Sequence, residues 1–151
     1  MVIFGVNDHY NVRQKLNLIT FGVDDLERSL SFYEKGLGWK RSAKSMDGLV
    51  LFPLGGITLA LYPREELADD VTLPYTPVEF SGLTLSYNAK SEREVDEVLE
   101  QVAALGASIV KPGQKVFWGG YSGYFKDPDG HLIEVAYNPF WELDGEDNLK
   151  L

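Results

Sequence analysis

An aromatic stretch interspersed with glycines is the part of the sequence best suited to holding a ligand. Residues 117–125 read FWGGYSGYF, in which five rings stand among three glycines. Glycine lets a flat molecule approach the backbone closely, and the face of an aromatic ring attracts cations. We therefore expect Trp118, Tyr121 and Tyr124 to contact a ligand. In the alternative interpretation, some of these rings belong to the core and the glycines mark β-bulges.

Few other side chains are suited to covalent or metal chemistry. The chain has no cysteine, which excludes disulfides, thiolate zinc sites and cysteine nucleophiles. We expect its two histidines, His9 and His131, to be solvated surface imidazoles. Ser122 has no positioned histidine partner, and the sequence contains neither a Gly-x-Ser-x-Gly elbow nor a phosphate-binding loop. No pairing of a nucleophile with a base is therefore visible.

Composition and charge limit the partners of the protein. The 151 residues are 44% hydrophobic and 25% charged, which is typical of one globular domain covering residues 1–151. The net charge of −9 opposes nucleic-acid binding, and it serves either solubility or the attraction of a cationic ligand. No apolar run approaches the ~20 residues of a membrane span, and no signal peptide is recognisable. We expect a cytoplasmic protein with no nucleic-acid or membrane partner.

Two predicted helices, one in each half of the chain, must position the candidate residues. Ser91–Glu94 forms a capping box, in which the hydroxyl and the carboxylate each satisfy a free backbone N–H group. Apolar residues then recur at helical spacing within 95–103, and Gly106 supplies a left-handed stop. In the first half, Asp24 or Asp25 caps a similar but shorter amphipathic segment. Each helix carries one apolar stripe, so each needs a sheet to cover.

Predicted strands surround both helices in the same order. They cover residues 16–23, 40–43, 49–52 and 57–62 in the first half, and 83–89, 107–110, 120–126 and 132–137 in the second. The order β-α-β-β-β thus occurs twice, which is more informative than any single element. We assign a first module to residues 16–62, a second to 81–138, and a linker rich in acids and prolines to 63–80.

Alternation within the strands distinguishes their two faces. In residues 83–89 the odd positions are apolar and the even ones, such as Thr84, are polar; Thr20 has the same parity in the first strand. The apolar face should lie beneath the helices, and the other face should line an open surface. The sequence therefore predicts an α+β fold of two tandem βαβββ modules that form a curved mixed sheet, with an open concave cleft and helices on the outer face.

Two motifs resemble a known superfamily. The segment 23–38, which contains VDDLERS, FY and GLG, resembles the first-helix signature of the glyoxalase/bleomycin resistance/extradiol dioxygenase (vicinal oxygen chelate) proteins. The segment YFKDPDGHLIE, residues 124–134, resembles their second-half signature and is the more specific of the two. Its Asp127-Pro128-Asp129-Gly130 also has the composition of a tight turn between two strands. The resemblance covers residues 16–138.

This resemblance implies a divalent-metal site in the cleft, at four positions on the flanking strands of the two modules. In this sequence those positions are Leu18, Thr84, Ala60 and Glu134. Only Glu134 is a competent ligand, whereas catalytic sites use about three protein ligands. We therefore predict no metal and no other cofactor, with a divalent metal as the alternative. Glu134 is instead a candidate acid, base or anchor for a cationic group, or simply a solvated strand residue.

Two functional hypotheses follow from the resemblance. In the first, the protein binds a small organic molecule in the cleft, as bleomycin-resistance proteins do; in the second, it is a metal-dependent lyase, isomerase or dioxygenase. An accessory domain without a ligand is a third possibility. The expected ligand-binding residues are Leu18, Thr20, Ala60, Thr84, Trp118, Tyr121, Tyr124 and Glu134. Phe140 and Trp141 follow the last strand and favour a homodimer.

Overall fold

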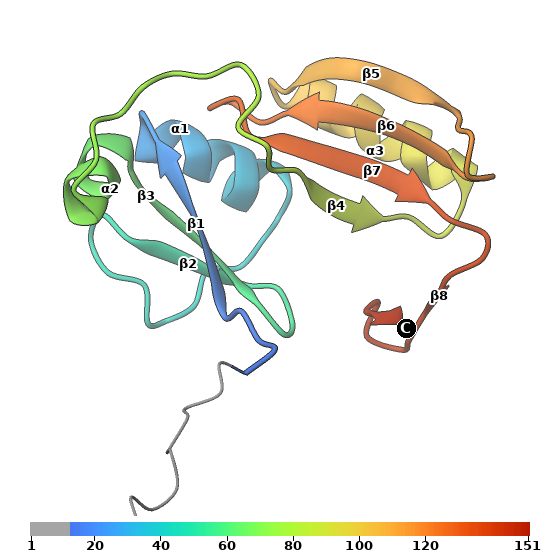
Figure 1. The fold of residues 1–151 in the computed structure, drawn as a ribbon, viewed down its shortest axis with the longest axis horizontal. Helices are drawn as coiled ribbons and strands as arrows, with labels where there is room; N and C mark the ends of the chain where they lie inside the picture. Colours follow the sequence, from blue (N-terminus) through green and yellow to red (C-terminus); the bar gives the residue numbers. More distant parts are fainter. Residues whose placement is uncertain (1–12) are drawn as a thin grey trace, which may run out of the picture.

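The chain folds into two modules of the same β-α-β type, joined by a segment that contains a short helix (Figure 1). The computed structural model describes residues 13–151. The first module comprises β1 (Leu18–Val23), α1 (Leu26–Leu30), a π-helical continuation η1 (Ser31–Gly36), β2 (Val50–Pro53) and β3 (Thr58–Pro63). The second comprises β4 (Leu85–Asn88), α3 (Glu92–Ala104), β5 (Ser108–Lys115), β6 (Tyr121–Lys126) and β7 (Leu132–Tyr137).

The sheet of the first module repeats the topology of the second with one strand fewer, and the predicted α+β architecture is confirmed. The strand orders are β1-β3-β2 and β4-β7-β6-β5, with β1 parallel to β3 and β4 parallel to β7. In the first sheet Thr20 lies opposite Ala60, and in the second Ser86 lies opposite Glu134. This register makes Thr20 the counterpart of Ser86. The two sheets are not hydrogen bonded to each other, so the open surface consists of two adjoining sheets.

Both helices begin with the caps that the sequence predicts. The Asp25 side chain accepts a hydrogen bond from the Arg28 N–H at 3.2 Å, and Ser91 Oγ accepts one from the Glu94 N–H at 3.0 Å. The Glu94 carboxylate reaches back to the N–H of Lys90, one residue before the cap. Because these groups satisfy N–H donors that no helical carbonyl can reach, each cap marks where its helix starts.

The hydrophobic core lies between the helices and the sheets and includes residues of both modules. Phe21 and Val23 on β1 are 3% and 1% exposed, as their odd strand positions predict. Val95 on α3 and Val135 on β7 belong to the same buried cluster. In Figure 1, α3 lies behind the sheet of its own module, which it contacts through β5, β6 and β7. A common core of this kind holds the two sheets in a fixed relation.

Two sequence predictions differ from the structure. Residues 40–43 form no strand; a hydrogen bond from the Ser42 N–H to the Leu51 carbonyl, at 2.7 Å, connects this segment to β2. The predicted linker contains α2 (Arg64–Val71), which starts after Pro63 and ends at Thr72 in the left-handed conformation (φ 60°). Prolines and acids suggested an irregular linker, but two of the acids, Glu65 and Glu66, fall in the first turn of α2, where the helix dipole favours them.

The segment after β7 adds a small hairpin of β8 (Glu142–Leu143) and β9 (Leu149–Lys150). It is attached to both modules. Asp147 forms an ion pair with Lys90 of the second module at 2.8 Å, and the Asn148 side chain lies against Gly55 in the turn between β2 and β3. Among residues 13–151, no helix is both long enough and apolar enough to cross a membrane.

Candidate functional site

Glu134 stands near the middle of β7, on the face of the sheet opposite α3. Ser86 Oγ on β4 donates a hydrogen bond to Glu134 Oε1 at 3.0 Å, and Tyr124 on β6 lies directly opposite in the antiparallel register. Burial raises the pKa of the Tyr124 hydroxyl, and the negative charge of Glu134 raises it further. None of the ion pairs formed within residues 13–151 includes Glu134. Its carboxylate therefore has neutral partners only among the described residues, and it can accept a further, positively charged donor from a ligand.

A cavity of about 300 Å³ opens beside this carboxylate. Its polar and aromatic lining residues are Lys111, Lys115, Phe117, Trp118, Ser122, Tyr124 and Glu134. Lys115 already forms an ion pair with Glu92 on α3. Lys111 has no carboxylate partner within the described part of the chain. The cavity thus offers one carboxylate, one ammonium group and an aromatic wall, a combination suited to a small polar molecule.

The glycines among the aromatic residues mainly accommodate rings and backbone of the protein itself. The Trp118 ring occupies the space where a side chain at Gly120 would be, and the Phe140 ring does the same at Gly119. A Cβ atom on Gly123 would lie 2.6 Å from the Lys111 carbonyl oxygen, where β5 departs from regular pairing. The bulge and packing interpretation therefore accounts for these glycines, and the cavity is formed by the side chains around them.

The predicted ligand-binding residues do not gather at one place. Trp118, Tyr124 and Glu134 line the cavity just described. Thr20 lines a different and larger cavity of about 620 Å³ between β1, α2 and the turn before β7. Leu18 is 51% exposed at the start of β1, and Thr84 is exposed just before β4; neither lines either cavity.

Two of the predicted ligand-binding residues lie where they cannot contact a ligand in the cleft. Ala60 is completely buried, because its short side chain lies in the central strand β3 between Thr20 and Leu51. The Tyr121 hydroxyl donates a hydrogen bond to Asp96 on α3 at 2.8 Å, so its ring lies on the helix side of the sheet. Tyr121 and Tyr124 are three positions apart, and strand alternation places such residues on opposite faces. Strand alternation by itself therefore places Tyr121 on the helix side of the sheet.

Ser86, Ser122 and Lys111 were not predicted to belong to the site. Ser122 is only 2% exposed and has the same strand parity as Tyr124, so alternation alone indicates that it belongs with Glu134. Ser86 becomes the neighbour of Glu134 through the parallel pairing of β4 with β7. For Lys111 the sequence carried no signal, because its position follows from an irregularity in the pairing of β5 with β6.

His131 is not the solvated imidazole that we expected. Its side chain is 23% exposed, and its ring stacks on Phe21 with 4.0 Å between centroids and 8° between planes. Its Nδ1 atom lies 3.0 Å from Oδ2 of Asp127, which also accepts a hydrogen bond from the Tyr33 hydroxyl at 2.8 Å. Burial alone would raise the pKa of Asp127, but the contacts with His131 and Tyr33 outweigh burial and lower it. His9 lies outside the described residues.

The second aspartate of the DPDG turn attaches the two modules to each other. Asp129 Oδ1 accepts hydrogen bonds from the Asp24 N–H at 2.9 Å and from Arg28 Nη2 at 2.8 Å, and Oδ2 accepts one from Ser29 Oγ at 3.1 Å. The Asp129 side chain is fully buried. The two most recognisable sequence motifs of the chain thus meet in space, where they hold the modules together.

Residues 13–151 of one chain do not fit a catalytic divalent metal. Within residues 13–151, no three side chains of His, Cys, Asp or Glu are grouped closely enough to hold a metal ion. Glu134 is accompanied by the hydroxyls of Ser86 and Tyr124, which are poor ligands for zinc, nickel or iron. At the other implied positions, Leu18 and Ala60 have no donor atom in their side chains, and Thr84 offers only a hydroxyl.

Comparisons with known proteins agree with the architecture and the motifs. Residues 15–135 match the family model of the Glyoxalase/Bleomycin resistance protein/Dioxygenase superfamily. The chain is 32% identical to metallothiol transferase FosB of Lysinibacillus sphaericus over 80% of either protein. It is 29% identical to glutathione transferase FosA of Serratia marcescens, over 81% of this chain and 79% of that protein.

A solved structure shows the same fold over nearly the whole chain. A glyoxalase-related enzyme from Fulvimarina pelagi superposes with a TM-score of 0.83 at 31% identity, covering 92% of this chain and 99% of that one. The family match extends from β1 to β7, so it includes both modules and the segment between them. The chain belongs to the Glyoxalase/Bleomycin resistance protein/Dioxygenase superfamily.

Proposed function

We propose that the protein binds a small polar organic molecule in the cavity beside Glu134, without a catalytic metal. The observation that carries the proposal is the carboxylate of Glu134, oriented by Ser86 and lacking a cationic partner within residues 13–151, at the edge of a cavity walled by Trp118. A partly desolvated carboxylate binds a ligand that brings a positive charge or a hydrogen-bond donor. Trp118 adds a face for an apolar or cationic group.

Lys111 indicates what the other end of the ligand carries. Because this lysine lines the same cavity and has no carboxylate partner in the described part of the chain, it suits an anionic or hydrogen-bond-accepting group. A molecule with an ammonium group and a carboxylate at opposite ends satisfies both charges at once. The dimensions of the cavity, about 300 Å³, suit a molecule with one ring or fewer.

The test uses 4-(aminomethyl)benzoate, which has an ammonium group, a ring and a carboxylate, in calorimetric titrations. We expect saturable binding that is weakened about tenfold or more by Glu134→Gln and by Lys111→Met, since each removes a charge-assisted hydrogen bond. Glu100→Gln, which changes an exposed carboxylate on α3, is the matched control and should bind as the unaltered protein does. Binding that is equal in all four proteins, or absent at millimolar ligand, contradicts the proposal.

A metal-dependent enzyme is the second candidate, and the comparisons favour it specifically. Relatives at 32% and 29% identity are named metallothiol transferase and glutathione transferase, which indicates transfer to or from a thiol rather than the lyase, isomerase or dioxygenase reactions expected from the resemblance. In that case, ligand atoms beyond Glu134 have to come from residues 1–12 or from another chain. Elemental analysis of protein purified without chelator distinguishes the two: near-stoichiometric zinc, nickel, iron or manganese that is lost in Glu134→Ala supports the enzyme.

We also propose that the chain acts as one domain and assembles as a homodimer in the cytoplasm. Support for the dimer comes from Phe140 and Trp141, which are 74% and 50% exposed in the isolated chain. Large apolar side chains gathered on a surface mark an interaction site. The absence of cysteine from the whole sequence fits a reducing compartment.

A further inference from the structure

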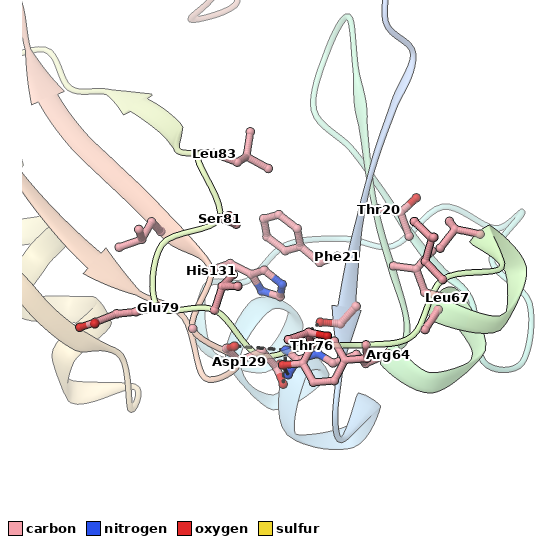
Figure 2. A pocket seen from close by; sticks show the side chains of 18 of the residues that line it. Thr20, Phe21, Arg64, Leu67, Thr76, Glu79, Ser81, Leu83, Asp129 and His131 are labelled. Atoms are coloured by element: carbon pink, nitrogen blue, oxygen red, sulfur yellow. Dashed lines mark hydrogen bonds and ion pairs between the residues drawn. The ribbon is translucent and has the colours of Figure 1, made fainter.

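The larger cavity, of about 620 Å³, lies away from Glu134, at the junction of the two modules and the segment that joins them. Figure 2 shows Leu67 of α2 and Thr20 of β1 on one side, Ser81 and Leu83 on another, and Phe21 beside His131 between them. Neither Glu134 nor any other residue of the smaller cavity lines it. Its volume falls within the range of sites for small organic ligands, about 300–1,000 Å³.

Most of the cavity wall is apolar and open to solvent in the isolated chain. Leu73, Val78 and Leu83 are 66%, 65% and 53% exposed, and Val71 and Tyr75 are 51% exposed. All five side chains line this one cavity. Exposed apolar surface of this kind, concentrated around a concave site, favours an apolar occupant because covering it removes the surface from water.

Among the polar residues that line the cavity, His131 has a ring nitrogen that the protein holds in a fixed position. Its Nδ1 atom contacts the buried Asp127 carboxylate at 3.0 Å, and its ring is held flat against Phe21. None of the hydrogen bonds within residues 13–151 uses the other ring nitrogen, Nε2. A carboxylate that accepts from Nδ1–H fixes the tautomer in which Nε2 is an acceptor. The structure therefore presents a rigidly held acceptor at the cavity wall.

Of the charged residues that line the cavity, Arg64 and Asp129 are already engaged by the protein, and the Glu79 side chain points away from His131 in Figure 2. Arg64 donates to the Tyr75 hydroxyl at 2.7 Å and to the carbonyls of Gly22 and Asp129 at 3.3 and 3.2 Å. The Asp129 carboxylate is fully buried and accepts three hydrogen bonds from the first module. An occupant therefore gains little by carrying a charge at this end, and a neutral donor suits the site better.

We propose that this cavity is a second ligand site, independent of the one at Glu134, and that it takes a small aromatic molecule bearing one hydroxyl, which donates a hydrogen bond to Nε2 of His131. The ring of the ligand packs against the apolar residues of segment 71–83, and its hydroxyl donates a hydrogen bond to the His131 imidazole. Thr20, Thr76 and Ser81 also line the cavity, but His131 carries the acceptor that the protein holds rigidly in place, and this acceptor matches the hydroxyl of the ligand. A phenol is the simplest molecule of this class.

Calorimetric titration with 4-ethylphenol and with 4-ethylanisole, in which a methyl group replaces the hydroxyl proton, tests the proposal on the full chain. We expect 4-ethylphenol to bind at one site per chain, about three- to tenfold more tightly than 4-ethylanisole, which is the usual effect of one neutral hydrogen bond. In His131→Phe, which keeps a ring against Phe21, the two molecules should bind equally. Equal binding of the two molecules to the unaltered protein, or no saturable binding at millimolar concentrations, overturns the proposal.

A second variant covers the case in which His131→Phe does not fold. Val78→Lys changes an exposed wall residue outside the core and places a charge in the apolar part of the cavity, so 4-ethylphenol binding should fall at least about tenfold. Unchanged binding in this variant overturns the proposal. Addition of 4-(aminomethyl)benzoate should leave 4-ethylphenol binding unaffected, because the two sites share no residue. If either molecule displaces the other, the two sites are not separate and the proposal is contradicted. If only 4-(aminomethyl)benzoate fails to bind, the result contradicts the proposed function at Glu134 and leaves this second site supported.

Discussion

Removal of the Tyr33 hydroxyl tests how the two modules are held together. This hydroxyl donates to Asp127 at 2.8 Å across 94 positions of sequence, Tyr33 is 2% exposed, and the Asp127 side chain is 1% exposed. In Tyr33→Phe the ring keeps its place and only this hydrogen bond is lost. Asp127 retains bonds from the backbone N–H groups of Asp129 and His131, both at 2.9 Å, and its contact with Nδ1 of His131. The carboxylate therefore keeps partners, and the variant should still fold.

The expected cost is that of one buried hydrogen bond to a charged acceptor, about 1.5–3 kcal/mol of unfolding free energy. For a chain of this length, that corresponds to a fall in Tm of roughly 3–12 °C. Tyr87→Phe is the matched control. Its hydroxyl also donates to a carboxylate, that of Glu94 at 2.6 Å, but Tyr87 is 46% exposed. Water replaces the lost bond there, so the control should cost no more than about 0.5 kcal/mol.

The pH dependence of the unfolding free energy gives a second test of the hydrogen bond between Tyr33 and Asp127. The folded-state pKa of Asp127 is lowered, so the stability it contributes is present above its unfolded pKa of about 3.9 and is lost as the pH falls through the folded value. The difference between Tyr33→Phe and the unaltered protein should therefore be full at pH 7 and shrink below about pH 4. Urea denaturation at several pH values measures it. Equal losses in Tyr33→Phe and Tyr87→Phe, or a difference that does not change down to pH 3, would refute the reasoning.

Three further predictions follow from the packing. Light scattering should give the mass of two chains, because Phe140 and Trp141 are exposed in one; a single-chain mass over a wide concentration range would exclude the dimer. Gly123→Ala should lower the unfolding free energy by about 1–3 kcal/mol in urea, because its Cβ would lie 2.6 Å from the Leu99 side chain; an unchanged midpoint would show that this contact relaxes freely. Asp129→Ala should cost about 3–5 kcal/mol by the same assay, because it leaves three donors of the first module without their acceptor, whereas a loss under about 1 kcal/mol would mean that water replaces the carboxylate.

Local patterns in the sequence were sufficient for most of the fold. The capping residues Asp25 and Ser91 start the helices where predicted, because a cap depends on residues within one turn of each other. Strand alternation correctly placed Phe21 and Val135 beneath the helices, because the two-residue period is a property of any strand. The repeated β-α-β order then left few topologies open. The helix in the joining segment escaped prediction because its helix-forming residues lie among prolines and acids that also suit a loop.

The candidate sites depend on contacts that no local pattern encodes. Glu134 could be singled out from its motif, but Lys111 reaches the same cavity through irregular pairing of β5, and Ala60 is covered by its neighbours on both sides. Tyr121 was the exception, since alternation alone places it on the helix side. The environment of His131 follows from Phe21 and Tyr33, which lie about 100 positions away in the chain. The sequence determines on which face of its strand each side chain lies. The packing of the two modules determines which of these faces come into contact and which cavities remain between them.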